Sequence, residues 1–256
     1  LFRLVRLAAP TQRLPRALVV GLCDYATALT RTERDVEPAF VVAEVAPDDA
    51  ALLRAVALFA DRLDEKARPR FVPVVRRAIA GCADPGQRDT LEILLCRFLS
   101  LEADTARECD ALAATLLERH QDPAARAAIY FARSEQRMRA GDPSGALEDV
   151  DEALAFRLAD SSSVLHRRVL LLERLHRDAE CLAEARRYLE RAGLGLGVGS
   201  RYAHVVWLAW SAGRRAGELG EARWAVEALV RARPDAGGWR VRLAWLERAM
   251  SDDPAP

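Results

Sequence analysis

The chain has 256 residues, of which 51% are hydrophobic and 30% are charged. This composition excludes a disordered polypeptide and is sufficient for one elongated repeat domain or for one to two globular domains. The formal net charge of +0 excludes a global attraction to nucleic acid or to an acidic membrane surface, so a charged partner has to be recognised by local patches.

The first thirty residues predict neither a membrane span nor a signal peptide. The longest apolar run, residues 17–29, is shorter than the roughly 20 residues that cross a bilayer, and it contains Asp24. The opening segment is interrupted by Arg3 and Arg6, which a signal sequence does not allow in its apolar part. Because the chain begins at Leu1, we expect a fragment of a longer protein.

The cysteines indicate a reducing compartment, and we predict a cytoplasmic location. Their number is odd, their spacing is wide, and no Cys-x-x-Cys pair occurs, which is typical of small buried side chains and not of a disulfide framework. They are Cys23, Cys82, Cys96, Cys109 and Cys181.

Apolar residues recur at helical spacing along nearly the whole chain, and no segment shows the alternation of a strand. Short polar or Gly/Pro clusters separate helix-sized segments. In chain order these breaks are residues 44–49, 66–70, 82–87, 120–123, 141–143, 159–163, 193–200 and 234–238. Asp122 and Asp142 each precede a proline, which predicts an N-cap followed by proline in the first helical turn.

Two segments, residues 139–160 and 215–235, repeat each other. Each has a turn glycine followed five positions later by a small residue, Gly141 with Ala146 and Gly217 with Ala222. The small residue allows two helices of a hairpin to approach closely. The offset of 76 residues equals two periods of about 38. Weaker copies place Cys181 and, more faintly, Cys109 at the small position, although the Cys181 copy lacks the turn glycine.

This pattern resembles the tetratricopeptide repeat (TPR) family, best over residues 141–155 and 217–234 and more loosely over 104–250. Arg133, Ser134 and Arg137 depart from the family's Leu-Gly and Tyr positions. The resemblance implies an all-α fold, a right-handed α-solenoid of antiparallel helix hairpins whose first helices line a concave groove. We predict N-terminal helical hairpins over 1–103, the TPR-like region over 104–250 and a disordered tail over 251–256.

Positions that match the family's groove-facing residues give a candidate partner-binding set. Arg139, Arg174 and Arg215 share one repeat position, and Phe131, His166 and Trp207 share another, so a basic column lies beside a partly aromatic one. Such a surface can hold an acidic or C-terminal peptide, although arginines at this position are more often solvated helix ends. The full set is Phe131, Glu135, Arg139, His166, Arg174, His204, Trp207, Arg214 and Arg215.

Motifs for other chemistries lack their required context. The alternating glycines of residues 193–197 follow a helical segment and not a strand, so they indicate a loop and not a dinucleotide site. Glu173 and His176 form a single Glu-x-x-His, whereas a di-iron bundle needs two. No protease, hydrolase or P-loop signature accompanies Cys109 or Cys181. We therefore expect no cofactor, no metal and no catalysis.

All five tryptophans lie in the last fifty residues, together with Arg240, Arg242 and Arg248. Trp239 follows two glycines in a segment that we interpret as a loop, where an exposed tryptophan would be an interaction anchor. The five tryptophans are Trp207, Trp210, Trp224, Trp239 and Trp245.

The sequence thus predicts a protein-interaction or scaffold domain that binds a peptide segment or partner helix, acidic segments included, with single-stranded nucleic acid less favoured. The alternative is a helical accessory or effector-sensing domain of a larger bacterial enzyme or transcription regulator.

Overall fold

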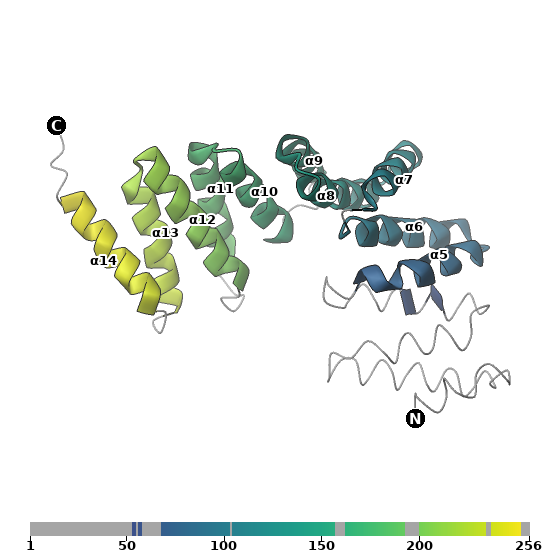
Figure 1. Cartoon of the computed structure of the whole chain (residues 1–256), viewed down its shortest axis with the longest axis horizontal. Helices are drawn as coiled ribbons and strands as arrows, with labels where there is room; N and C mark the ends of the chain where they lie inside the picture. The colour runs from purple at the N-terminus through teal and green to yellow at the C-terminus, as the bar shows by residue number, and fades with distance from the viewer. Residues whose placement is uncertain are drawn as a thin grey trace, which may run out of the picture. The chain divides into compact units, whose positions relative to one another are not determined.

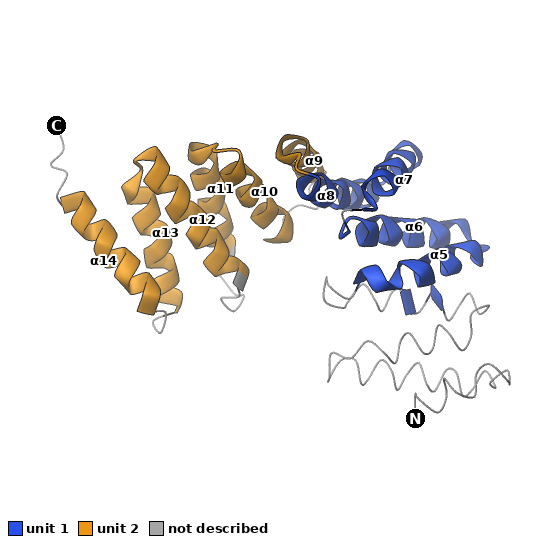
Figure 2. Ribbon diagram, viewed as in Figure 1, with its two compact units in different colours: residues 1–140 blue, residues 141–256 orange. Residues whose placement is uncertain are grey.

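The computed structural model describes residues 53–54, 56–57, 68–102, 104–156, 162–192, 200–233 and 237–251. Within these ranges every regular element is a helix and none is a strand. Contacts divide the chain into two compact units, unit 1 (Leu1–Ala140) and unit 2 (Gly141–Pro256) (Figure 2). For the described residues, the predicted all-α fold is confirmed.

In unit 1, a short 3-10 helix is followed by helices that pack consecutively, each against the one before it (Figure 1). The short connections make neighbouring helices antiparallel. α8 also packs on α6, so successive helix pairs stack. The elements are η1 (Arg68–Phe71), α5 (Val72–Ala80), α6 (Pro85–Leu99), α7 (Ala106–Arg119) and α8 (Pro123–Arg139).

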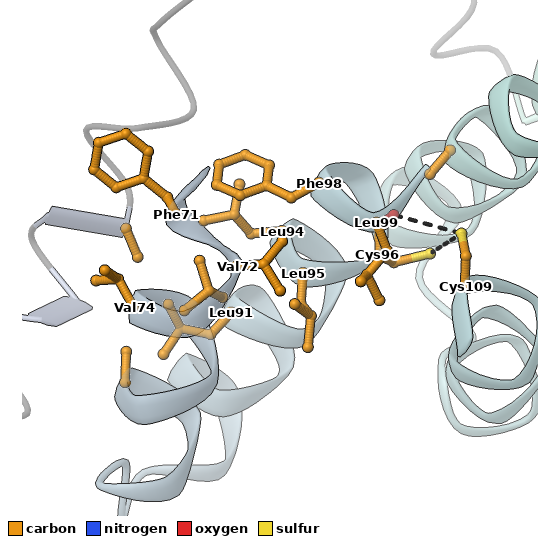
Figure 3. Close-up of a cluster of buried hydrophobic side chains, with 14 of the residues drawn as sticks. Phe71, Val72, Val74, Leu91, Leu94, Leu95, Cys96, Phe98, Leu99 and Cys109 are labelled. Atoms are coloured by element: carbon orange, nitrogen blue, oxygen red, sulfur yellow. Dashed lines mark hydrogen bonds between the residues drawn. The ribbon is translucent and has the colours of Figure 1, made fainter. Parts of the chain in front are cut away.

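The described core of unit 1 includes side chains of η1, α5, α6 and α7 (Figure 3). Phe71 and Phe98 are fully buried there together with leucines of α6. The thiols of Cys96 on α6 and Cys109 on α7 lie 3.9 Å apart, and the Cys109 thiol also donates to the carbonyl oxygen of Cys96 at 3.5 Å. These two cysteines are small buried side chains, as the sequence predicted.

Unit 2 continues the same pattern of consecutive antiparallel helices. In addition to the contacts between neighbours, α10 packs on α12 and α11 packs on α13, so the first helices of successive hairpins touch each other and so do the second helices. This is the stacking of a repeat protein. The helices are α9 (Pro143–Ala155), α10 (Ser162–Arg174), α11 (Asp178–Ala192), α12 (Ser200–Ala216), α13 (Leu219–Ala232) and α14 (Gly237–Ser251).

Three helices begin with the combination Asp-Pro. The side chains of Asp84, Asp122 and Asp142 accept a hydrogen bond from the backbone N–H of the residue three positions later, at 2.8 to 2.9 Å. Proline occupies the first turn, where a missing N–H leaves no helical bond unmade. The N-caps predicted at Asp122 and Asp142 are confirmed.

The repeat register is visible in the first turn of four helices. Cys109, Ala146, Cys181 and Ala222 are each fully buried. Each donates its backbone N–H to the carbonyl oxygen of the residue four positions earlier, at 2.9 to 3.2 Å. The fainter copies at Cys109 and Cys181 therefore occupy the same buried position in their helices as the two clear ones, and the predicted repeat register is confirmed for these four helices.

Close helix approach explains the small residue at this position. A Cβ atom added to Gly213 on α12 would lie 2.8 Å from the Cβ of Ala222 on α13 and 3.0 Å from the carbonyl oxygen of Glu218. Real Cβ atoms do not approach so closely, so α12 and α13 touch without room for another methyl group.

The turns before α9, α11 and α13 each contain a residue with positive φ. Gly141 has φ 84° and Gly217 has φ 75°, as the sequence pattern predicts for turn glycines. In the middle hairpin this position is His176, with φ 55°. The N–H of Arg177 donates to the carbonyl of Leu172, and that of His176 donates to Glu173. Backbone bonds therefore form the left-handed helix end without glycine.

Several predictions lie outside the described residues, namely those for residues 1–52, for the glycine-rich segment 193–199 and for the tail after residue 251. Among the helices that the structure does describe, none combines the length and the apolar character that crossing a bilayer requires. Trp239 was expected in a loop, which is wrong, because α14 begins at Gly237 and Trp239 lies in its first turn.

Candidate functional site

The nine predicted partner-binding residues fall on three first helices. Phe131, Glu135 and Arg139 lie on α8 in unit 1, where Phe131 and Glu135 are half-buried and Arg139 is exposed. The other six lie on α10 and α12 of unit 2, and they are His166, Arg174, His204, Trp207, Arg214 and Arg215. The partner-binding role of the whole set stays a prediction.

Helices α10 and α12 meet along a surface that we call the polar seam. It joins residues 38 positions apart in the sequence, so equivalent residues of successive hairpins bond to each other. The bonds are Arg201 Nη1 to Ser163 Oγ at 2.7 Å, His166 Nε2 with His204 Nδ1 at 2.9 Å and Ser211 Oγ to Glu173 Oε1 at 3.4 Å.

Arg215 closes one end of the polar seam. It donates to Glu173 at 2.8 Å, to Asp178 at 2.7 Å and to Ser211 at 2.9 Å. Hydrogen bonds to Asp178 and Glu173 raise the pKa of Arg215. Its guanidinium is thus engaged within unit 2, in contrast to Arg174, which is exposed and makes no ion pair with any described residue.

The histidines of the polar seam are neutral at neutral pH. Burial, the neighbouring His204 and the cations Arg167 and Arg201 lower the pKa of His166 to about 4. Burial also lowers the pKa of His204. One neutral imidazole can donate to the other, so the 2.9 Å contact is a hydrogen bond within the protein.

A second surface joins α12 to α14 and has a different chemistry. The guanidinium of Arg214 lies 4.9 Å from the ring centre of Trp210 and 4.7 Å from that of Trp245. The guanidinium of Arg242 lies 5.5 Å from Trp210 and 4.8 Å from Trp239. Cation–π attraction holds these groups together. We call this set, Trp239, Arg242, Trp210, Arg214 and Trp245, the tryptophan–arginine ladder.

Exposed aromatic area adjoins the ladder. Trp207 is 42% exposed and Trp245 is 45% exposed, and α14 also exposes Val241 and Met250. Large apolar side chains left in contact with water on neighbouring helices are typical of interaction surfaces. The predicted partner-binding set included Trp207 and Arg214 but not Trp210, Trp245 and Arg242. The clustering of tryptophan and arginine near the C-terminal end of the chain was the sequence feature that pointed to these three residues.

The structure places the residues that the sequence offered for metal or nucleophilic chemistry. No three His, Cys, Asp or Glu side chains gather among the described residues as a metal ion requires. Glu173 bonds to Arg215, and His176 lies in the turn after α10, so the Glu-x-x-His is divided between a helix and a turn. Burial raises the pKa of Cys181 to about 12, so this thiol stays protonated and is a poor nucleophile.

Comparison with known proteins adds a distant likeness. No protein-family model and no curated protein sequence matches the chain. Among solved structures, the crystal structure of the P58(IPK) TPR domain is similar at 13% sequence identity and a TM-score of 0.34, over 88% of this chain and 76% of that one. The helical-repeat stacking described above is shown by the chain's own helix contacts and repeat register.

Proposed function

We propose that the chain is a non-catalytic protein-interaction domain, which binds an extended segment or a helix of a partner protein on the first helices of its repeats. The observation that supports this most directly is the exposure of Trp207 on α12 and Trp245 on α14. These two residues are one repeat period apart, on helices joined by the tryptophan–arginine ladder. Tryptophan buried by a partner is a frequent source of binding energy at protein interfaces.

We place the proposed binding surface around Trp207, Arg214 and Trp245 and not on the polar seam. His166, His204 and Arg215 already bond within unit 2, and a ligand would have to replace those bonds. The surface around Trp207, Arg214 and Trp245 carries no such cost, because these side chains are exposed to solvent and make no hydrogen bond or ion pair with a described residue.

Site-specific photo-crosslinking in the native cell tests this function. A photoreactive phenylalanine analogue replaces Trp207 in the full chain, and the control carries it at Glu190, which is exposed on α11. We expect one reproducible protein partner to be captured from position 207 and not from position 190. The same captured proteins at both positions, or none at position 207, would contradict the proposed function.

A further inference from the structure

We propose that the tryptophan–arginine ladder recognises carboxylates, and that its ligand is an acidic, extended segment of a partner protein. This inference rests on the proposed function and adds the chemical class of the ligand. It is argued from the free donors of the ladder, from the charge of the helices that carry it and from the spacing of its two guanidinium groups.

The ladder contains hydrogen-bond donors without acceptors. Arg214 makes no hydrogen bond or ion pair with another described residue and is held by Trp210 and Trp245 alone. Arg242 donates one bond, from Nη1 to the carbonyl oxygen of Gly238 at 3.1 Å. The indole Nε1 of Trp210 is buried and has no acceptor among the described atoms. A cation–π contact uses none of the N–H groups of a guanidinium in a hydrogen bond, so those of Arg214 remain available to a carboxylate.

The helices that carry the ladder are basic. α12 contains Arg201, Arg214 and Arg215 and no acidic residue. α14 contains three arginines and one acidic residue, Glu247, which lies 4.0 Å from Arg223 on α13. The second helices, in contrast, are not basic, because α11 contains four acidic residues against three arginines and α13 contains two of each. In a chain of zero net charge, positive charge therefore concentrates on the first helices, which attracts an acidic segment to that side.

The two arginines can be reached by one short segment. Both guanidinium groups lie over the ring of Trp210, at 4.9 and 5.5 Å. Acidic side chains two residues apart in an extended peptide point to the same side and lie about 7 Å apart, so one short segment can reach two guanidinium groups that share one indole ring. The exposed rings of Trp207 and Trp245 then offer apolar contact to the residues between or beside the carboxylates.

A nucleic acid is less well matched to the ladder than a peptide. Stacking of bases requires free indole faces, whereas Trp210, Trp239 and Trp245 each already have a guanidinium group over the ring. Among the exposed tryptophans, only Trp207 has no described cation over it. A column of stacked bases is therefore not available, and carboxylates remain the preferred anions.

Selection from a random peptide library displayed on phage tests this assignment with the full chain as bait. We expect the unmodified chain to enrich peptides that combine aspartate or glutamate with an apolar residue. The affinity of the best enriched peptide, measured by fluorescence anisotropy, should fall about tenfold for Arg214→Gln and further when Arg242→Gln is added. The control Arg107→Gln removes the same charge from an exposed position on α7 and should leave the affinity unchanged.

Circular dichroism and the thermal midpoint establish that each variant is folded. Trp245→Leu is a second test, because it keeps both arginines but removes one of the two indole rings that Arg214 contacts. It should lower the affinity for the enriched peptide about threefold or more. The inference would be overturned if the selected peptides were not enriched in aspartate or glutamate. It would also be overturned if Arg107→Gln and Arg214→Gln lowered the peptide affinity equally. Tighter binding of an oligothymidylate than of the peptide would overturn it as well. Capture of a protein at position 207 combined with any of these results would leave the proposed function standing.

Discussion

The α10–α12 contact and the α12–α14 contact of unit 2 are built on the same helix, α12, and follow the same period, but their side chains do different things. In the polar seam, hydrogen bonds and ion pairs satisfy the polar groups internally, including both histidines and Arg215. In the tryptophan–arginine ladder, arginines lie over indole rings and Arg214 has no acceptor among the described residues. Equivalent positions of a repeat can therefore either bond within the protein or keep hydrogen-bond donors without an acceptor among the described residues.

Two neighbouring residues make the contrast sharp. Arg214 and Arg215 are adjacent in the sequence, yet Arg215 bonds to Glu173 and Asp178 whereas Arg214 lies over Trp210 and Trp245. Adjacent positions on a helix point about 100° apart, so one faces α10 and the other faces α14. Substitutions at these two positions are expected to affect different properties of the molecule.

The largest effect is expected from Gly213→Ala, because α12 supports both contacts and its packing on α13 allows no added methyl group. In an open helical position this exchange stabilises by roughly 0.5 to 1 kcal/mol. At Gly213 we expect a loss of about 2 to 3 kcal/mol in the free energy of unfolding, measured by urea titration. Gly220→Ala on α13, where no atom lies within 4 Å of the added Cβ, is the control and should stabilise. A stabilising Gly213→Ala would refute the close approach.

The second effect concerns the polar seam. Arg215→Gln leaves the carboxylates of Glu173 and Asp178, whose side chains are only 16% and 17% exposed, without their shared cation. We expect a loss of about 2 kcal/mol in the free energy of unfolding. Urea titration measures it, and little change in peptide affinity should accompany it. A change below the error of the titration would mean that the ion pairs contribute no net stability.

The third effect is a dependence of stability on pH. An ordinary histidine titrates near 6.5, whereas the pKa of His166 is lowered to about 4 in the folded chain. As pH falls, the unfolded state takes up the proton first, so stability is full above about pH 6.5 and declines toward about pH 4. Between about pH 7 and pH 5 we expect a loss of about 1 kcal/mol, after a discount for partial exposure.

The matched variant for this pH dependence is His166→Phe, which cannot take up a proton at position 166. Its free energy of unfolding should change less over the same pH interval than that of the unmodified chain. Parallel pH curves for the two proteins would contradict the lowered pKa of His166.

The smallest effect on stability is expected from Arg214→Gln, in the ladder. An exposed guanidinium group over indole rings contributes modestly, and we expect a loss below about 1 kcal/mol in the free energy of unfolding. The same change should strongly lower the affinity of the chain for an acidic peptide. Arg215→Gln should therefore lower the stability more than Arg214→Gln does, whereas Arg214→Gln should lower the peptide affinity more than Arg215→Gln does. If one variant lowers both properties more than the other, the two surfaces are not functionally distinct.

Local patterns in the sequence predicted much of the fold. The Asp-Pro pairs marked helix starts at Asp122 and Asp142, because capping depends on neighbouring residues only. The small residues marked the repeat register, since a buried close contact admits few side chains. Even Cys109, in the faintest copy, is at the expected structural position.

The candidate site was less predictable, because it depends on contacts between helices that are far apart in the sequence. Repeat alignment placed Arg174 and Arg215 in one column, but whether an arginine finds a carboxylate depends on Glu173 and Asp178 of the neighbouring hairpin. The ladder required knowing that Trp239 lies on a helix beside Trp210, whereas the two glycines before it indicated a loop.

His176 has a consequence for how such repeats are found in genomes. The left-handed turn after α10 is closed by backbone hydrogen bonds, and a histidine occupies the position where the two clearer copies have glycine. A search profile that weights this glycine heavily will miss hairpins of this kind and undercount the repeats. The small buried residue in the following helix, alanine or cysteine in all four copies, is the better diagnostic for diverged members.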